Sequence, residues 1–342
     1  KIHKFIFNDS VIVSAKDYTI TTDTMHYFSN SEISLFYGPS YIVSKKNQIY
    51  CEYGWYNTKS DIGEITKNSY INTENYILKS DTIIYEKKLG YIKAINNVQL
   101  IDTLEHITVF GGLGEYFELK NKAKIQKKPI LQLLLKEDTL FMHANQFIYQ
   151  KKEKKQLLAY NKVKFFKTDF QGKCDSLSYN INDSLIRMFI EPILWSNEFQ
   201  ITADSIKFMI YEEEIKKMFL KPNPMIISKE DSIDYNQIKG KEMIAFFDEN
   251  KMNKIDIIGN GQSIFIVNDD EKNNAKIGLN YIESTNLCLY FQENKLKNVT
   301  YHIQPSSTSI PYQDTKEEDR YLKGFSSRES ERPKKMKDIF IE

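Results

Sequence analysis

The chain has few of the residues that build a disulfide framework, a metal centre or a membrane-spanning helix. Its three cysteines, Cys51, Cys174 and Cys288, are odd in number and far apart, which excludes a disulfide framework and gives no metal-type spacing. No run of 18 apolar residues is present, so we expect no helix that spans a bilayer. Basic and acidic residues number 47 and 46, and this balance gives no argument for a nucleic-acid partner.

Glycine and proline are also scarce, at 13 and 8 of 342 residues, whereas tyrosine and phenylalanine number 22 and 21. This composition favours pleated, half-buried surfaces over helices. The first residues, KIHKFIFNDS, do not form a signal peptide and predict a strand already under way. We therefore expect the chain to be a mature or trimmed piece of something longer.

A short run that closes on an aromatic residue recurs along the chain, at intervals of about 29 to about 44 residues. The copies are TTDTMHY, YCEYGWY, KSDTIIY, FGGLGEY, HANQFIY, KCDSLSY, TADSIKF, GKEMIAF and STNLCLY, which close at Tyr27, Tyr56, Tyr85, Tyr116, Tyr149, Tyr179, Phe208, Phe246 and Tyr290. After each polar turn comes an alternating run with a small, amide or proline residue at its middle, such as YIKAINNVQLID or LIRMFIEPILWS. Alternation predicts strands with one buried face, and the central residue predicts a bulge or bend.

These repeats predict an all-β fold over residues 1–305, an elongated, twisted jellyroll of two facing antiparallel sheets built from about nine stacked two-strand units. Residues 306–342 lack periodicity and predict an extended or disordered tail. The alternation places one set of side chains inside. The predicted lining residues are Met25, Tyr27, Ile83, Tyr85, Val98, Leu100, Phe147, Tyr149, Val163, Phe165, Leu177, Tyr179, Ile193, Trp195, Ile206, Phe208, Met225, Ile227, Ile244 and Phe246.

The repeat resembles the LptA/OstA family of periplasmic lipopolysaccharide-transport proteins in diderm bacteria. Members carry repeated I-x-A-D-x-φ-x-Y units followed by G-N-V-x-φ, where φ is apolar. The aspartate is kept at Asp23, Asp81, Asp175 and Asp204, and the second element survives in degenerate form, as in Asn96-Asn97-Val98. The resemblance covers roughly residues 5 to 303, so the chain looks like the long OstA-like proteins, and its Asn-, Lys- and Ile-rich composition suits a Bacteroidota relative.

The resemblance implies a V-shaped jellyroll that bridges the periplasm and holds the acyl chains of lipopolysaccharide in an apolar groove. It implies no enzyme activity, no metal and no cofactor. The expected partners are lipopolysaccharide or a related glycolipid, and other bridge components that pair strands end to end. The expected location is the periplasm, with the outer membrane as a place of association, and any signal peptide is expected to have been removed. The four motif aspartates are expected to be structural, because they recur at strand positions suited to turn or edge hydrogen bonds.

Two other interpretations stay open at this point. A right-handed β-helix that acts on polysaccharides would also show repeats, although its rungs need three short strands. A purely structural sandwich explains the aromatic pattern as well as a lipid-binding groove does. Gly111-Gly112-Leu113-Gly114 resembles a phosphate loop only superficially, because no Lys-Ser/Thr follows it, and we expect a local kink there.

Overall fold

The computed structural model describes residues 3–45, 47–102, 104, 106–135, 138–151, 153–212, 214–269, 275–293 and 295–341. These residues form strands and short 3₁₀ turns, and every described strand pair is antiparallel. The chain divides into two compact units, residues 1–160 and 161–342. The all-β prediction is confirmed. The β-helix alternative is wrong, because its rungs would pair in parallel.

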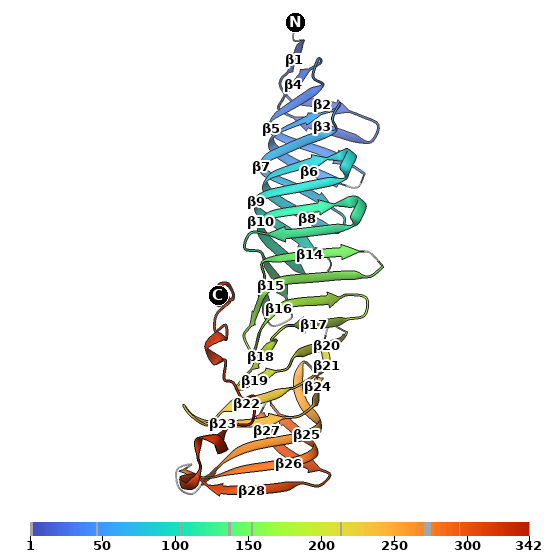
Figure 1. The fold of residues 1–342 in the computed structure, drawn as a ribbon. Helices are drawn as coiled ribbons and strands as arrows, with labels where there is room; N and C mark the ends of the chain where they lie inside the picture. Colours follow the sequence, from blue (N-terminus) through green and yellow to red (C-terminus); the bar gives the residue numbers. More distant parts are fainter. Residues whose placement is uncertain are drawn as a thin grey trace. The chain divides into compact units, whose positions relative to one another are not determined.

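Unit 1 is a sheet of consecutive strands that stack one beside the next (Figure 1). Its strands are β1 (Lys4–Phe7), β2 (Val11–Ser14), β3 (Tyr18–Thr22), β4 (Thr24–Phe28), β5 (Ile33–Ser44), β6 (Asn47–Asn57), β7 (Ile62–Thr73), β8 (Tyr76–Glu86), β9 (Tyr91–Asp102), β10 (Ile107–Phe117), β11 (Lys122–Gln126), β12 (Ile130–Leu134), β13 (Thr139–His143), β14 (Gln146–Lys151) and the start of β15 (Lys155–Lys167). The 3₁₀ turns η1 (Lys87–Leu89) and η2 (Glu118–Lys120) connect two of the hairpins.

Each long strand bends near its middle, and the bends divide the sheet into two walls. Along β9 the bend lies at Asn96 and Asn97, with φ of 59° and 48°, and the β8–β9 register shifts opposite these residues. Asparagine tolerates this left-handed backbone better than most residues do. The predicted bend at Asn-Asn-Val is confirmed. Each long strand thus crosses both walls.

We name the walls by the strand segments that they contain. The first wall of unit 1 contains β1, β4, β11, β14, the start of β15 and the turn-side halves of β5–β10, for example residues 82–86 of β8. The second wall contains β2, β3, β12, β13 and the other halves, for example residues 76–79 of β8. We call the bend between them the corner.

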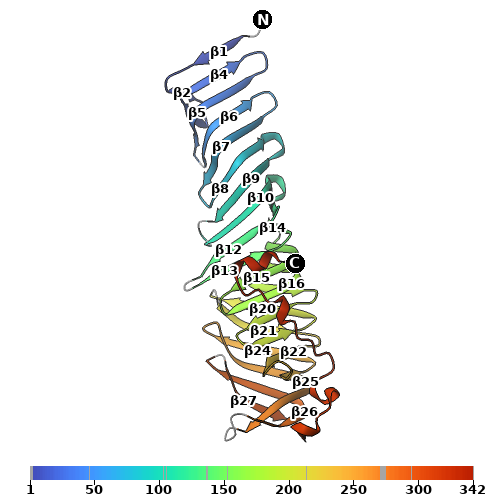
Figure 2. The same cartoon turned by 90° about the vertical axis from the view of Figure 1, so that its left-hand side faces the viewer.

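Unit 2 repeats this plan (Figure 2), but several of its strands are interrupted at the bend, whereas β25 and β26 are continuous over 19 and 18 residues. After the end of β15 it contains β16 (Phe170–Asn180), β17 (Leu185–Phe189), β18 (Ile193–Ser196), β19 (Phe199–Thr202), β20 (Ser205–Tyr211), β21 (Glu214–Leu220), β22 (Met225–Lys229), β23 (Tyr235–Lys239), β24 (Glu242–Asp248), β25 (Lys251–Asp269), β26 (Ala275–Gln292), β27 (Lys295–His302) and β28 (Ser306–Pro311). Its second wall runs through β18, β19, β22 and β23. Its first wall runs through β17, β20, β21 and β24.

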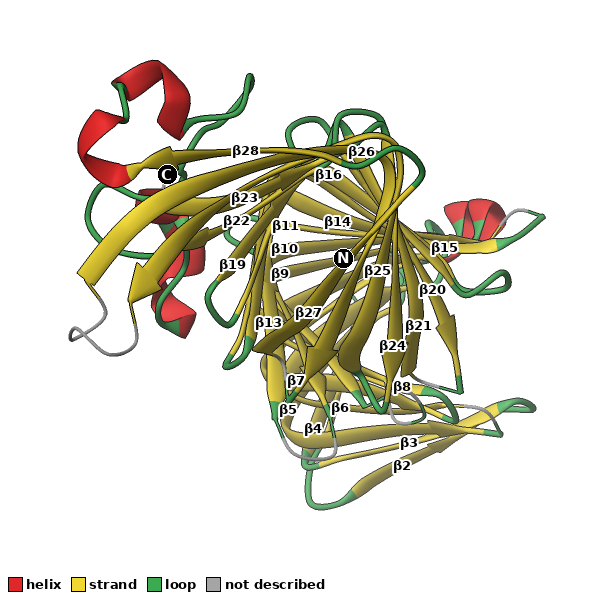
Figure 3. Cartoon of the chain, turned by 90° about the horizontal axis from the view of Figure 1, so that it is seen from below, coloured by secondary structure: helices red, strands yellow, loops and turns green. Residues whose placement is uncertain are grey.

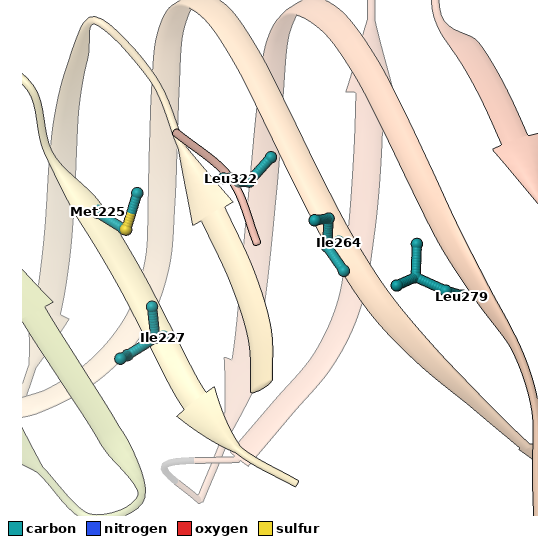
Figure 4. Close-up of a cluster of buried hydrophobic side chains, with 5 residues drawn as sticks. All are labelled: Met225, Ile227, Ile264, Leu279 and Leu322. Atoms are coloured by element: carbon teal, nitrogen blue, oxygen red, sulfur yellow. The ribbon is translucent and has the colours of Figure 1, made fainter. Parts of the chain in front are cut away.

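The C-terminal segment, residues 312–341, lies across the outside of the second wall of unit 2, and we call it the strap. It contains the 3₁₀ turns η3 (Tyr312–Asp314), η4 (Glu317–Arg320), η5 (Glu329–Glu331) and η6 (Met336–Phe340), drawn red in Figure 3. Leu322 of the strap is 5% exposed and packs with Met225, Ile227, Ile264 and Leu279 (Figure 4).

Three glutamines of the second wall hold the strap. The Gln237 amide donates to the Arg320 carbonyl at 2.6 Å, and its oxygen accepts from the Leu322 N–H at 2.8 Å. Gln200 makes the same pair of bonds to the Ser326 carbonyl and the Arg328 N–H, at 2.8 and 2.7 Å. The oxygen of Gln171 accepts from Arg332 Nε at 2.8 Å. The strap is therefore held through its backbone by Gln237 and Gln200 and through the Arg332 side chain by Gln171.

Buried charge holds the start of the strap. Asp234, whose side chain is 1% exposed, accepts from the Tyr312 hydroxyl at 2.6 Å and is paired with Lys276 at 2.6 Å and Arg320 at 3.4 Å. A buried carboxylate needs such partners, because desolvation otherwise disfavours its charge. The predicted division at residue 305 thus differs from the structure. Residues 306–311 form β28, and the following residues are extended but packed on the sheet.

Candidate functional site

The inner faces of the two walls meet in an apolar layer in unit 1. Ile20 of the second wall packs with Met25 and Phe36 of the first wall, and Tyr27, Ile42 and Tyr56 extend this cluster. Directly paired residues on neighbouring strands point to the same side of a sheet, so the pairing shows which residues of each next strand share this inner face. Residues in register with Met25 and Phe36 therefore face inward all along unit 1.

Beside the corner, the inner row of the first wall is fully packed. Ile83 and Ala94 are each 1% exposed, and Phe147 and Ala159 are 3% and 1% exposed. Large and small residues alternate across paired strands, as in Ile83 opposite Ala94 and Phe147 opposite Ala159. This alternation lets the side chains interdigitate, so the layer next to the corner is closed core.

Further from the corner lies a second inner row, in which every other strand contributes a tyrosine. We call Tyr27, Tyr56, Tyr85, Tyr116 and Tyr149 the tyrosine row. The residues between them in register are Ser34, Gly63, Ile92 and Ala123. A Cβ on Gly63 would lie 2.8 Å from the Tyr56 ring, so glycine is needed where this ring covers the neighbouring strand. All five tyrosines are half-buried, unlike the row at the corner.

The second wall supplies aliphatic residues to the same layer. Ile42, Ile49, Leu78 and Leu100 are half-buried and lie in one register, in which Ile49 pairs with Ile42 and Leu78 pairs with Leu100. The same register includes buried members, Ile71, Val109 and Leu131, which are 8%, 8% and 4% exposed. Next to the corner Val98 is 1% exposed. The inner faces of unit 1 thus change from buried core at the corner to half-buried Tyr, Ile and Leu toward the free ends of the walls.

Burial holds the tyrosine hydroxyls in their protonated form. It raises the pKa of Tyr85 and Tyr116, and the nearby Glu118 carboxylate raises both further. Burial likewise raises the pKa of Tyr149, with a further contribution from Asp102. The Tyr56 hydroxyl differs, because it donates to Asp61 Oδ1 at 2.8 Å. Protonated phenols in an apolar layer are hydrogen-bond donors.

The predicted lining residues of unit 1 all lie on these inner faces. The structure places Met25, Tyr27, Ile83, Tyr85, Phe147 and Tyr149 on the first wall, and Val98 and Leu100 on the second. Tyr56 and Tyr116 belong to the same layer but were missed as lining residues. Glycine precedes each of them by two positions, at Gly54 and Gly114, so the expected apolar pair was absent. Their closing-aromatic position in the repeat was the available signal.

In unit 2 the inner faces are more completely filled. Val163 and Phe165 are 0% and 4% exposed, and the Phe165 ring lies over Gly172, where a Cβ would come within 2.2 Å of it. Phe170 stands between Phe165 and Phe208, with ring centroids 5.7 and 6.3 Å away. The predicted residues Leu177, Tyr179 and Ile206 share the first-wall face with Phe208.

Four predicted lining residues lie instead on the outer face of the second wall, beneath the strap. Met225 and Ile227 pack against Leu322, and Ile193 and Trp195 share their face through the registers Trp195–Gln200 and Gln200–Ile227. The inward residues of these strands are their neighbours Leu194 and Ile226, 0% and 2% exposed. The strap buries the outer face, so Ile-Leu-Trp and Met-Ile-Ile show no alternation from which to choose a face.

The structure also differs from the prediction at Ile244 and Phe246. Met243 and Ala245 are the buried residues of β24, 1% and 0% exposed, and they pair with Leu220 and Met218. Phe246 lies on the outer face with Lys217 and Lys254, 5.3 and 5.5 Å from its ring centroid. Two aromatic residues, Phe246 and Phe247, close this repeat. Aligning on the first of them shifted the register by one residue, which inverts the face.

The motif aspartates lie at the corner, opposite the left-handed residues; Asp81 and Asp175 lie within strands, and Asp23 and Asp204 lie in bends between two strands. Asp81 accepts two hydrogen bonds from the Asn97 amide, at 3.1 and 2.9 Å, and Asp204 accepts one from Asn223 at 3.0 Å. Asp23 contacts the bend at Gly38, while Asp175 accepts from its neighbour Ser176 at 2.7 Å. These bonds bridge or line the bends and bring no second catalytic-type group to the aspartates.

Other chemistry-bearing groups are scattered. Among the described residues no group of three or more His, Cys, Asp or Glu side chains could hold a metal ion. The three cysteines are buried, and burial raises the pKa of the Cys51 thiol to about 11 and that of Cys174 to about 12. Gly111 and Gly112 lie at the corner of β10, where the register shifts. Within the described part of the chain, no helix is long and apolar enough to cross a membrane.

Residues 2–81 match the family model of OstA-like proteins. The N-terminal part of the chain is therefore similar to OstA-like proteins. The match covers β1 to β8 up to Asp81, and so includes the inner-face cluster of Ile20, Met25 and Phe36.

Two solved structures show a distant similarity to the chain. LptH of Pseudomonas aeruginosa, described as the LptA-homologous periplasmic component of the lipopolysaccharide transport device, is 7% identical, with a TM-score of 0.18 over 39% of this chain and 75% of that chain. The WD40 domain of SCAP from fission yeast is 8% identical, with a TM-score of 0.13 over 91% of both chains. No curated protein matches the chain.

Proposed function

We propose that this OstA-like chain binds the acyl chains of lipopolysaccharide, or of a related glycolipid, between the inner faces of its two walls. In this role it is a non-enzymatic bridge component in the periplasm that shields the lipid on its way to the outer membrane. The sugars project outward, and no covalent step is required of the protein.

The observation that carries the proposal is the gradient of burial in unit 1. Next to the corner the inner side chains are closed core, whereas Tyr85, Ile92, Leu78 and Leu100 toward the free ends are apolar and half-buried. Acyl chains placed against this layer would gain about 25 cal/mol for each Å² of apolar surface removed from water. The OstA-like match over residues 2–81 supports the same assignment.

The proposal includes partners at the sheet ends. In the described chain β1 pairs only with β4, and its residues Phe5, Ile6 and Phe7 are 50%, 52% and 47% exposed. An edge strand with free backbone groups and exposed aromatic side chains is suited to accept a strand from another bridge component.

A matched pair of photocrosslinking positions tests the lipid site. Ile92 and Lys93 are neighbours on β9, and both are half-buried, but Ile92 pairs with Tyr85 on the inner face while Lys93 pairs with Ile84 on the outer face. A photoreactive residue at position 92 should form adducts with lipopolysaccharide in cells and with the purified lipid, whereas position 93 should not. Equal labelling at both positions, or no labelling at either position, would contradict the proposal. The second outcome would leave a closed structural sandwich.

A further inference from the structure

We infer that the hydroxyls of Tyr85, Tyr116 and Tyr149 form a hydrogen-bonding register for the ester or amide carbonyls that join acyl chains to a lipid head group. The inference rests on the proposed lipid site and deepens it. The apolar layer would bind the hydrocarbon of the acyl chains. The three hydroxyls would bind the carbonyl groups at the head-group end of these chains, and so fix how deeply the chains enter the layer. The ligand class is thus an acyl lipid with carbonyl linkages, rather than any long hydrocarbon.

The three tyrosines occupy equivalent places on alternate strands. Tyr85 and Tyr116 both pair with Ile92, and Tyr116 and Tyr149 both pair with Ala123. Two strand spacings separate successive members, roughly 9–10 Å. Because the intervening residues are apolar or small, the hydroxyls are the regularly repeated polar groups of this inner row.

These hydroxyls are placed to donate. Each ring is half-buried, and no hydrogen bond joins the hydroxyls of Tyr85, Tyr116 and Tyr149 to another described residue. Tyr56 is excluded from the proposal because its hydroxyl is already bonded to Asp61. A half-buried phenol without a partner gains most from an acceptor that arrives with an apolar ligand, and carbonyl oxygens are such acceptors.

The position of the row along the wall supports a boundary role. Tyr85 and Tyr116 lie near the turns at η1 and η2, where Lys87, Lys88 and Lys120 are exposed. Deeper in the wall, Ile83 and Gly114 line the buried corner row. Tyrosine is suited to such a boundary, because its ring is apolar and its hydroxyl is polar.

The decisive experiment removes hydroxyls and keeps rings. The triple variant Y85F/Y116F/Y149F is compared with Y41F/Y50F/Y70F, which removes as many hydroxyls from the outer face of the second wall in the same unit. A fluorescent fatty acid is bound first. It is then displaced by a diacyl phosphatidylcholine or by the dialkyl-ether lipid with the same chains, which lacks carbonyls.

The unmodified chain should prefer the diacyl lipid over the ether lipid by at least about fivefold, the effect of one net hydrogen bond. The inner triple variant should bind both lipids with equal affinity, and the outer triple variant should keep the preference. Equal binding of both lipids by the unmodified chain, or a preference that survives in the inner triple variant, would overturn the inference while leaving acyl binding intact. Failure of the fatty acid and both lipids to bind at all would instead overturn the proposed function.

Discussion

The outer face of the second wall is partly exposed in unit 1 and is covered by the strap in unit 2. In unit 1 it carries a tyrosine ladder, with ring centroids of Tyr41 and Tyr50 5.0 Å apart and those of Tyr50 and Tyr70 5.4 Å apart, and Tyr41 is 39% exposed. In unit 2 the strap covers this face, and Trp195 beneath it is 0% exposed. The same bent-strand plan therefore yields a wall with one buried face in unit 1 and two in unit 2.

The inner faces of the two units also differ in how far their aromatic side chains are buried. Unit 1 leaves the tyrosine row half-buried, whereas in unit 2 Phe208 occupies the first-wall face and is 4% exposed. Phe199 and Phe291 of unit 2 pack edge to face, with centroids 5.6 Å apart. The second wall of unit 2 is thus buried on both sides, whereas unit 1 keeps a half-buried apolar layer. We expect unit 1 to carry the lipid and unit 2 to be the more stable.

Removing the strap should break this contrast most strongly. A chain that ends at Pro311 would uncover Trp195, Met225 and Ile227, and we expect the amides of β18, β19 and β22 to exchange hydrogen at least a thousandfold faster, equivalent to about 4 kcal/mol. Hydrogen-exchange mass spectrometry measures this, with β7 of unit 1 as the internal control. Unchanged protection in β22 would show that the strap does not stabilise the wall.

A single side chain of the strap should have the next largest effect. Leu322→Ala removes the apolar contact with Ile227 and Ile264 and should lower the free energy of unfolding of unit 2 by about 2–3 kcal/mol. Leu119→Ala is the matched control, since Leu119 is 83% exposed, and should change stability by less than about 0.5 kcal/mol. Denaturant titration gives both values, and equal effects would contradict the packing described.

The glutamine clamps should contribute less than the leucine. Gln237→Ala leaves the Arg320 carbonyl and the buried Leu322 N–H without their partner, at a cost of about 1–2 kcal/mol. Gln99→Ala on the outer face of the second wall in unit 1 should be almost neutral, because no side-chain hydrogen bond joins Gln99 to another described residue. A neutral Gln237→Ala variant, measured in the same titration, would mean that water replaces the clamp.

Acid should loosen the strap by the smallest amount. The Arg328 guanidinium, which bonds Glu331 at 2.5 and 2.8 Å, and the Lys173 ammonium lower the pKa of Glu331 to about 2. Because the unfolded chain binds this proton more tightly, the stabilisation is complete above about pH 4.5 and is lost as the pH falls toward 2. We expect a loss of about 1 kcal/mol, since the pair is partly exposed. Glu331→Gln should remove this part of the acid dependence of strap exchange.

Much of the architecture followed from local rules. The amide pair Asn96-Asn97 marked a bend because asparagine accepts the left-handed backbone, and the alternation of Ile83 and Tyr85 identified an inward face. The bends let one strand serve two walls, which the spacing of runs could not distinguish from two separate strands per repeat.

The errors arose where a distant segment changed the environment. At Ile193 and Trp195 a strand buried on both sides carries no period-two signal, and only the strap, more than a hundred residues away in sequence, explains why both sides are apolar. The polar composition of the strap concealed its docking, because its backbone makes many of its contacts. At Phe246 a doubled aromatic hid a one-residue change of register that local pattern could not resolve.

The spacing of the clamps has a consequence for how the strap finds its place. Arg320, Ser326 and Arg332 meet Gln237, Gln200 and Gln171, so the strap advances six residues for each clamp. A strap displaced by six residues would again offer backbone groups to two of the three glutamines. The glutamines therefore fix the spacing of the contacts along the strap, but they do not fix which residues of the strap make these contacts. We expect Leu322 to select one alignment of the strap, because only that alignment packs its side chain with Met225 and Leu279.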